Sequence, residues 1–254
     1  MIYFIGAGPG APDLITVRGA ELLRRAGMII YAGSLVNPAL LDYAPADCEI
    51  CDSASMTLEE VLERLLDGYH RGLLTIRLHT GDPSLYGAIR EQMDRLRASG
   101  VPFEVVPGVS SFCAAAAAVP AEYTLPGVSQ TVIISRMEGR TPVPERESIR
   151  SLAAHKASMV LFLSSGMLKA LCAELIMGGY PPETPAVLAY RASWPDERVL
   201  HGTLSNLPLL AEKAGISRTA LVLVGNFLGD EYELSKLYDA GFSHGYRKAR
   251  EGAE

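Results

Sequence analysis

The sequence predicts an α/β protein of two lobes, an N-terminal lobe with a mainly parallel sheet and a C-terminal lobe with a mixed sheet. Short apolar runs alternate with helical patterns through the first half, and repeated strand–helix–strand units form parallel sheets covered by helices. Two prolines and a glycine at 119–127 break this alternation. The strands expected at 185–190 and 197–203 are joined by a loop so short that they must pair antiparallel. We therefore expect lobes at residues 1–119 and 120–254, with the active site in the cleft between them.

The strands expected in the first lobe are short, apolar and rich in branched residues, as in strands that are buried on both faces. They lie at 2–5, 28–32, 73–78 and 103–106, with a weaker candidate at 48–51. Thr57 and Glu60 form a capping box, which an apolar stripe at helical spacing follows as far as Tyr69. Further helices are expected at 89–96 and 112–119. The strands of the second lobe are expected at 131–135, 159–163, 186–190, 198–200 and 220–224.

Composition excludes several classes of protein. With 48% hydrophobic and 20% charged residues, the 254-residue chain is typical of globular proteins rather than disordered ones. The net charge of -6 argues against a general binder of nucleic acid or of membrane surfaces, because both need clustered basic residues. The first residues form a strand-like run without the features of a signal peptide, and four cysteines are too few for a disulfide scaffold. We expect a cytoplasmic location.

Cys48 and Cys51 have the spacing of redox and zinc motifs. They fall in an expected strand, where residues three apart point to opposite faces, and no second pair completes a zinc site. The five histidines have no ligand-like spacing either. We therefore expect two structural cysteines and no protein-bound metal.

A glycine cluster follows the first strand at 6–13. Its G-x-G-x-x-A pattern begins at Gly6 and formally fits a dinucleotide site. Against that interpretation, Pro9 and Pro12 remove N–H donors from the turn, and the second strand runs into 31–34 without an acidic residue for a ribose. A purely structural turn remains an alternative for this loop taken alone.

Two more Gly/Pro turns follow the strands at 73–78 and 103–106. The first includes Asp82, whose carboxylate could accept hydrogen bonds from a ligand. The second ends at Ser110, a candidate N-cap for the alanine-rich helix. Ligands of open α/β sheets bind outside the carboxyl ends of the strands, where all three loops are expected. Three such turns on one rim favour a binding edge.

Together these segments resemble the tetrapyrrole methylase family, the class III S-adenosylmethionine-dependent methyltransferases. The matching segments are Gly6–Gly10 with Asp13–Thr16, Gly81–Pro83, Val106–Ser110, Leu125–Ile133 and Leu221–Gly225. Each segment is weak alone, but their order along nearly the whole chain is specific. Tyr31–Val36, Arg136–Pro144 and Tyr190–Asp196 are similar to the branch that methylates C-11 of precorrin-4. His79–Gly87 and Glu138–Glu145 are closer to enzymes acting on the cobalt complex, with the metal-free substrate as the near alternative.

The resemblance implies S-adenosylmethionine as methyl donor, a tetrapyrrole as substrate and a homodimer. The positions that it matches to the cofactor site are Pro9, Thr80, Gly81, Asp82, Leu85, Ser110, Ser111, Leu163, Ala192 and Ala220. Leu163 stands where related enzymes often have methionine, so an apolar contact would be kept. For Ala192 and Ala220, core packing is the alternative.

A sulfonium methyl is already electrophilic, so catalysis would consist mainly of alignment, which can be worth ~7–11 kcal/mol. No catalytic triad is expected, and Asp82 is the candidate polar group near the reacting centre. Arg136 and Arg140 are the candidates for binding substrate carboxylates, because guanidinium pairs with carboxylates in a bidentate manner. Two other functions stay open: a nicotinamide-dependent reductase and a non-catalytic tetrapyrrole carrier.

Overall fold

The computed structural model describes residues 1–33 and 35–249; Ser34, which belongs to the 31–36 motif, and residues 250–254 lie outside the described residues. The chain forms two compact units. Unit 1 comprises Met1–Ala118 and Arg191–Arg198, and unit 2 comprises Val119–Tyr190 and Val199–Glu254. The division falls next to the boundary expected at 119, whereas the return of 191–198 to unit 1 was not predicted.

Unit 1 is built on a five-stranded parallel sheet, which confirms the predicted fold class for this half. The strands are β1 (Ile2–Gly6), β2 (Met28–Tyr31), β3 (Glu49–Asp52), β4 (Thr75–His79) and β5 (Phe103–Val106). Their order is β3-β2-β4-β1-β5, and every neighbouring pair is parallel. The weak candidate at 48–51 is therefore a genuine strand at one edge.

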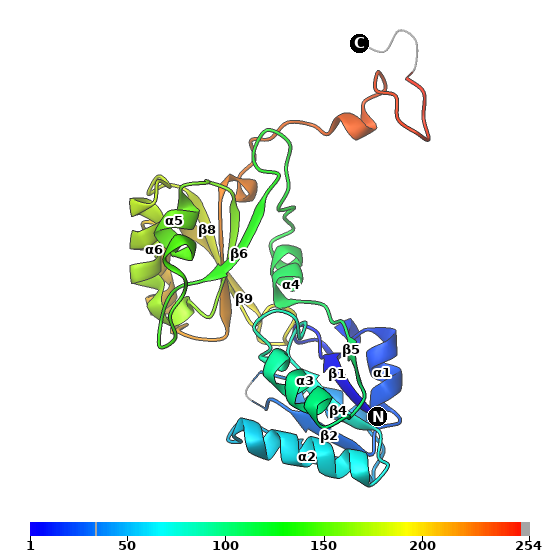
Figure 1. Ribbon diagram of the computed structural model, residues 1–254. Coiled ribbons are helices and arrows are strands. Elements are labelled where there is room, and N and C mark those ends of the chain that lie inside the picture. The colour runs from blue at the N-terminus through cyan, green and yellow to red at the C-terminus, as the bar shows by residue number, and fades with distance from the viewer. Residues whose placement is uncertain (34, 250–254) are drawn as a thin grey trace. The chain divides into compact units, whose positions relative to one another are not determined.

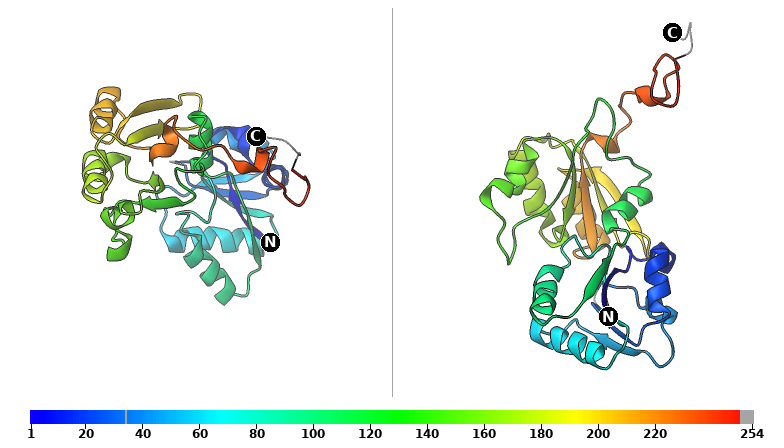
Figure 2. Two further views of the ribbon diagram at one scale, coloured as in Figure 1. Left: turned by 90° about the horizontal axis from the view of Figure 1, so that it is seen from above. Right: turned by 45° about the vertical axis from the view of Figure 1, so that its right-hand side comes forward.

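Helices cover both faces of this sheet. They are α1 (Val17–Leu23), α2 (Leu58–His70) and α3 (Ile89–Ala98), with short 3-10 turns at Pro12–Leu14 and Pro38–Tyr43. A fourth helix, α4 (Ser111–Ala118), follows β5 and contributes no residue to the core clusters of this sheet. Figures 1 and 2 show α2 and α3 together on one face and α1 on the other. Right-handed crossovers explain this arrangement: the chain moves towards β3 after β1 and β2, and back towards β5 after β3 and β4.

Each face of the sheet has its own apolar layer. Ile5, Ile29 and Leu78 belong to the layer under α1, and Phe4, Ile30 and Leu65 to the layer under α2 and α3. Cys48 packs on the first layer and Cys51 on the second, as their spacing predicts. Partial burial, helped by neighbouring Asp47 and Glu49, raises the pKa of the Cys48 thiol to about 11, so this thiol is not activated.

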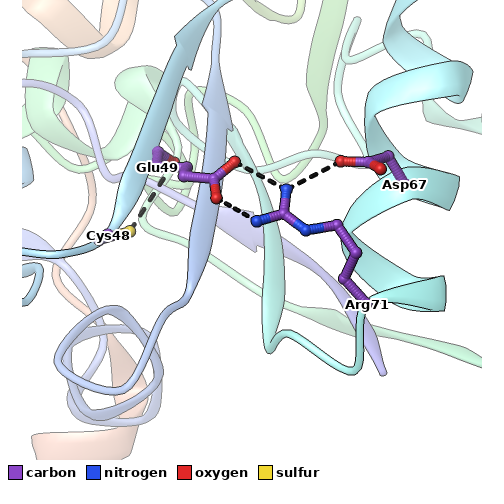
Figure 3. A network of polar contacts seen from close by, with 4 residues as sticks. All are labelled: Cys48, Glu49, Asp67 and Arg71. Atoms are coloured by element: carbon purple, nitrogen blue, oxygen red, sulfur yellow. Dashed lines mark hydrogen bonds and ion pairs between the residues drawn. The ribbon is translucent and has the colours of Figure 1, made fainter.

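Helix α2 begins at the predicted capping box. The Thr57 hydroxyl accepts the Glu60 N–H at 3.3 Å, and the Glu60 carboxylate accepts the Thr57 N–H at 2.7 Å. At the other end of α2, the guanidinium of Arg71 pairs with Asp67 of the same helix and with Glu49 of edge strand β3 (Figure 3). The helix is thus tied at both ends, by hydrogen bonds to its first turn and by ion pairs to the sheet edge.

Unit 2 contains the mixed sheet that the sequence predicts. Its strands are β6 (Val132–Arg136), β7 (Ser158–Phe162), β8 (Pro185–Tyr190), β9 (Arg198–Thr203) and β10 (Ala220–Val224), in the order β6-β7-β10-β8-β9. β6 and β7 are parallel, while β10 is antiparallel to both β7 and β8. Residues of α5 (Ile149–Ala153), α6 (Leu168–Met177) and α7 (Leu207–Ala214) share a single core cluster with the sheet. Figure 1 shows α5 and α6 on the same side of that sheet. No helix in the described part of the chain is long and apolar enough to cross a membrane.

Candidate active site

Three glycine loops meet at one edge of the unit 1 sheet. The first loop (6–13) follows β1, the second (80–87) follows β4, and the third (107–111) follows β5. Strands β4, β1 and β5 are neighbours and parallel, so their carboxyl ends lie next to one another. The structure thus brings together the three turns that the sequence predicts to form a binding edge.

Glycine is required where these loops touch. A Cβ on Gly6 would lie 2.5 Å from Gly108 Cα and 2.6 Å from the Gly81 oxygen, and a Cβ on Gly108 would lie 2.1 Å from that same oxygen. Contacts this short do not occur between real atoms, so the three backbones touch directly. Gly8 and Gly81 add a pair of hydrogen bonds, 2.8 Å and 3.2 Å long, between the first and second loops. The contact of the three loops therefore depends on backbone packing that no side chain could replace.

Asp82 joins the second loop to the third. Its Oδ2 accepts the Gly108 N–H at 2.8 Å, and its Oδ1 accepts the N–H and the hydroxyl of Ser84, at 2.8 Å and 2.5 Å. Partial burial opposes ionisation, but these hydrogen bonds outweigh it and hold the pKa of the carboxyl below its ordinary value. Asp82 is therefore a carboxylate at neutral pH, with both oxygens engaged by the protein.

The first loop has few N–H groups left for a pyrophosphate. The Gly8 N–H is bonded to the Gly81 oxygen and the Ala11 N–H to the Ser193 Oγ, while Pro9 and Pro12 have none. Dinucleotide sites of this type depend on free backbone donors at the turn. The geometry thus supports the sequence argument against a nicotinamide cofactor.

The second loop contains backbone conformations that are unfavourable for side chains. Tyr86 and Ala88 have φ values of 56° and 49°, in the left-handed region, and a Cβ on Gly87 would lie 2.2 Å from the Pro83 oxygen. Such conformations persist only when the surroundings impose them, and they cluster at functional sites.

A series of largely buried hydrogen bonds connects the end of this loop to the core of the sheet. Arg77 donates from Nε to Gln92 Oε1 at 3.3 Å and from Nη1 to the Ile30 oxygen at 3.2 Å, and Gln92 donates to the Ala88 oxygen at 3.2 Å. Burial lowers the pKa of the Arg77 guanidinium to about 10, which leaves it charged at pH 7. A charged group in the core is thus bonded, through Gln92, to the left-handed residue that starts α3.

The remaining candidates of unit 1 lie on or beside the three loops. Ser110 is buried at the N-cap position of α4, which begins at Ser111. Thr80 and Leu85 are half-buried on the second loop. Ala192, expected in the second lobe, is buried in the 191–198 segment of unit 1.

Leu163 and Ala220 belong to unit 2. Leu163 follows β7 with a φ of 52° and a side chain that is 64% exposed, which is unusual for leucine. Ala220 is the buried first residue of β10 and pairs with Tyr190. A strained, exposed apolar side chain at a strand end is available for a ligand contact, whereas Ala220 also serves the core.

The two candidate substrate arginines differ in their surroundings. Arg136 ends β6 and donates to the carbonyls of Met137, Thr141 and Pro142, between 2.8 and 3.4 Å. Arg140 is exposed on the following loop. Within residues 1–33 and 35–249, neither has a carboxylate partner, so both keep an uncompensated charge. Arg191, by contrast, pairs with Asp196 at 2.7 Å.

Sequence reasoning missed three residues that hold the first loop. Asn37 donates to the Gly10 oxygen at 2.8 Å, Trp194 donates to the Pro9 oxygen at 3.0 Å, and Ser193 accepts from Ala11 at 3.0 Å. Ser193 and Trp194 lie more than 180 residues along the chain from this loop. The only available signal was the resemblance in 190–196, which did not indicate what the segment touches.

Comparison with known proteins agrees with this geometry. The family described as Tetrapyrrole (Corrin/Porphyrin) Methylases matches residues 1–208. A cobalt-precorrin-4 C(11)-methyltransferase of Methanocaldococcus jannaschii is 50% identical over 249 residues, covering 98% of this chain and 96% of the relative. A precorrin-4 C(11)-methyltransferase of Pseudomonas aeruginosa is 46% identical, covering 97% and 98%.

Solved structures show the same architecture. A cobalt precorrin-4 methyltransferase, described as a cobalamin biosynthetic enzyme, superposes with a TM-score of 0.88 at 47% identity, covering 90% of this chain and 96% of that structure. The uroporphyrin-III C-methyltransferase of Thermus thermophilus, in complex with S-adenosylhomocysteine, gives a TM-score of 0.75 at 28% identity, covering 89% and 92%. With its three glycine loops on one sheet edge and this similarity along nearly its whole length, the chain belongs to the tetrapyrrole methylases.

Proposed function

We propose that this protein transfers the methyl group of S-adenosylmethionine to C-11 of cobalt-precorrin-4, in cobalamin biosynthesis. The observation that carries the proposal is the 50% identity, over nearly all of both chains, to a protein named for that reaction. Metal-free precorrin-4 is the second candidate substrate, because relatives named for it are also 46% identical. Another precorrin methyltransferase is the more distant possibility.

The arrangement of the loops suits a reaction that is catalysed by alignment. In this reaction a ring carbon supplies the electron pair for the new C–C bond, and the S–CH3 bond breaks with its electrons returning to sulfur. S-adenosylhomocysteine leaves as a neutral thioether, and the positive charge passes to the macrocycle, which releases a proton. No protein nucleophile takes part, so the residues need only to hold two ligands in a fixed geometry. We assign the cofactor to the three glycine loops, with Pro9, Thr80, Gly81, Leu85, Ser110 and Ser111 as contacts; Leu163, Ala192 and Ala220 remain predicted contacts. Asp82, ionised and bonded to Gly108, would keep the loops in register.

The substrate proposal depends on Arg136 and Arg140. A corrin precursor carries many carboxylates, and charge-assisted hydrogen bonds from guanidinium groups are the strong ones. Arg140 has no carboxylate partner among the described residues, and Arg136 donates only to carbonyls. Any cobalt would arrive within the substrate, and the absence of a protein-bound metal stays a prediction.

Two experiments test the proposal. Calorimetric titration with S-adenosylhomocysteine and, separately, with NADH should show binding of the first ligand alone. Binding of NADH alone would favour the reductase. Incubation with labelled S-adenosylmethionine and either cobalt-precorrin-4 or precorrin-4 should show faster label transfer to the cobalt complex. Faster transfer to the metal-free compound would select the second candidate, and no transfer to either would contradict the proposal.

We also propose that the protein is a cytoplasmic homodimer. Large apolar side chains are exposed along its C-terminal segment, and exposed apolar groups that gather in one region mark interaction surfaces. They are Tyr232, Leu234, Leu237, Tyr238, Phe242 and Tyr246. Sedimentation should give twice the chain mass of 27.3 kDa. Replacing Leu234 and Tyr238 with Ser should shift the protein towards monomer, and a wild-type protein that is monomeric at micromolar concentration would contradict the proposal.

A further inference from the structure

The segment Arg191–Arg198, which belongs to unit 1, makes several contacts within itself. Arg191 forms an ion pair with Asp196 at 2.7 Å, and its guanidinium lies 4.9 Å from the centre of the Trp194 ring. The Ser193 N–H donates to Glu197 at 2.6 Å. Arg191 and Ser193 adopt left-handed φ values of 47° and 70°, which ordinary side chains avoid. These contacts thus link Arg191, Ser193 and Trp194 to other residues of the same segment.

This segment makes its contacts with the first glycine loop through two residues. Trp194 Nε1 donates to the Pro9 oxygen at 3.0 Å, and Ser193 Oγ accepts the Ala11 N–H at 3.0 Å. Between these two bonds, the indole lies directly on the Gly10 backbone. A Cβ on Gly10 would lie 2.1 Å from Trp194 Cδ1 and 2.2 Å from its Nε1, so only glycine fits under the ring.

We infer that Trp194 is a positioning residue. Its indole ring, which packs on Gly10, fixes the first glycine loop in the conformation that receives the cofactor. This inference rests on the proposed function. Trp194 touches Pro9 and Gly10, and the adjacent Gly8 is bonded to Gly81 of the second loop. A shift of the indole would therefore be transmitted through the first loop to the second. Because the reaction depends on alignment, a small displacement of these loops weakens cofactor binding without unfolding the protein.

The test compares cofactor affinity in variants of the full-length protein. Trp194→Phe keeps an aromatic ring over Gly10 but loses the N–H to Pro9. Loss of one hydrogen bond should raise the Kd of S-adenosylhomocysteine about 2- to 10-fold. The KM for S-adenosylmethionine should rise in parallel while the KM for the tetrapyrrole stays constant, and the thermal midpoint should fall by only a few degrees, as expected for one lost hydrogen bond. Tyr43→Phe removes a polar atom from another aromatic residue of unit 1, outside the three loops, and should leave all four quantities unchanged.

A double-variant cycle tests the Gly10 contact. Gly10→Ala alone forces the loop away from the indole, so the Kd should rise more than in Trp194→Phe. Adding Trp194→Ala makes room for the new methyl, so the double variant should bind more tightly than Gly10→Ala alone, a strongly non-additive result. Additive effects of the two substitutions, or wild-type affinity in Trp194→Phe, would overturn the inference.

Trp194 is the single tryptophan of the chain, which gives a second measurement on the unmodified protein. Its emission should change on titration with S-adenosylhomocysteine and reach half of the full change at the calorimetric Kd. If the variants do not fold, unchanged emission at saturating ligand overturns the inference. A wild-type protein that does not bind S-adenosylhomocysteine at all contradicts the proposed function itself, whereas normal wild-type binding with unaffected variants removes only the role of Trp194.

Discussion

At the residue scale, Asp82 and His79 differ in how their environments set their charge, although they are three positions apart. Asp82 is half-buried and accepts three hydrogen bonds, so the ionised form is favoured. His79 is 5% exposed and stacks on Phe4, and among the described residues no group pairs with its Nε2. Burial, with a smaller contribution from Arg77, lowers the pKa of His79 to about 3. One residue is thus fixed as an anion and the other as a neutral ring.

Replacing Asp82 with Ala should remove the bond between the second and third loops. We expect a rise of about tenfold or more in the Kd of S-adenosylhomocysteine, because bonds to a charged group are worth ~1.5–3 kcal/mol each, and most methyl transfer should be lost. Calorimetry and the labelled-methyl assay measure the two effects. Ser84→Ala, which leaves the Gly108 bond intact, is the matched control and should have a smaller effect. Wild-type affinity and turnover in a folded Asp82→Ala protein would exclude this role.

The neutral state of His79 should make folding sensitive to acid. Its pKa is about 3 in the folded protein and 6.5 in the reference state, so below pH 6.5 the unfolded chain binds a proton that the folded protein refuses. The contribution of neutral His79 to the free energy of unfolding is fully present above pH 6.5. It falls as the pH decreases, by about 2 kcal/mol at pH 5. Urea unfolding at pH 7 and pH 5 should therefore show a smaller loss for His79→Asn than for the wild type. His70→Asn, at the exposed end of α2, should lose as much as the wild type; equal losses in all three proteins would show that His79 is protonated in the fold.

At the scale of elements, the sequence was sufficient wherever the signal was local. The central strands β1, β2 and β4 were found because both of their faces are buried, and α2 because its cap and its apolar stripe coincide. The three loops were found because glycine and proline mark tight turns. The 191–198 segment could not be placed in unit 1, because its contacts span more than 180 residues and its left-handed positions are occupied by Arg191 and Ser193 rather than glycine. Local patterns thus predict the elements, whereas contacts between segments far apart in the sequence are seen only in the three-dimensional structure.

The capping box gives a prediction that concerns one helix only. Thr57→Ala removes the acceptor for the Glu60 N–H and should lower the free energy of unfolding by about 0.5–2 kcal/mol, while Thr57→Ser should retain most of it. Hydrogen bonds with Thr57 lower the pKa of Glu60, so the separate stabilisation by the Glu60 carboxylate is present above the ordinary pKa of Glu and is lost as the pH falls through the lowered value. Urea unfolding measures the change, and methyl transfer should stay constant. Equal stability of the Ala and Ser variants would mean that the box contributes nothing.

At the scale of the whole molecule, the protein and its proposed substrate both carry a negative charge. The chain has a net charge of -6, and a corrin precursor is a polycarboxylate, so long-range electrostatics disfavour their association. Binding then depends on local positive charge that the protein does not neutralise itself. Arg18, Arg71, Arg90 and Arg150 form ion pairs with Asp or Glu. Arg136 and Arg140 have no such partner in the described residues. Arg136 ends β6 and Arg140 follows on the next loop, so two such charges lie close together in the sequence, which makes this loop our candidate for holding substrate carboxylates.

Arg140→Ala provides the cleaner test of this compensation, because Arg136 also holds its own loop through the Thr141 and Pro142 carbonyls. We expect the KM for the tetrapyrrole to rise several-fold, about 3- to 10-fold for an exposed charge-assisted pair, while the Kd of S-adenosylhomocysteine stays constant. The difference should shrink at high salt, because exposed charges are screened. Arg25→Ala, at the exposed end of α1, changes the net charge equally and should leave the KM nearly unchanged. If Arg140→Ala weakens cofactor binding but not substrate binding, Arg140 serves the cofactor. If Arg140→Ala and Arg25→Ala raise the KM for the tetrapyrrole equally, only net charge matters and no local site exists on this loop.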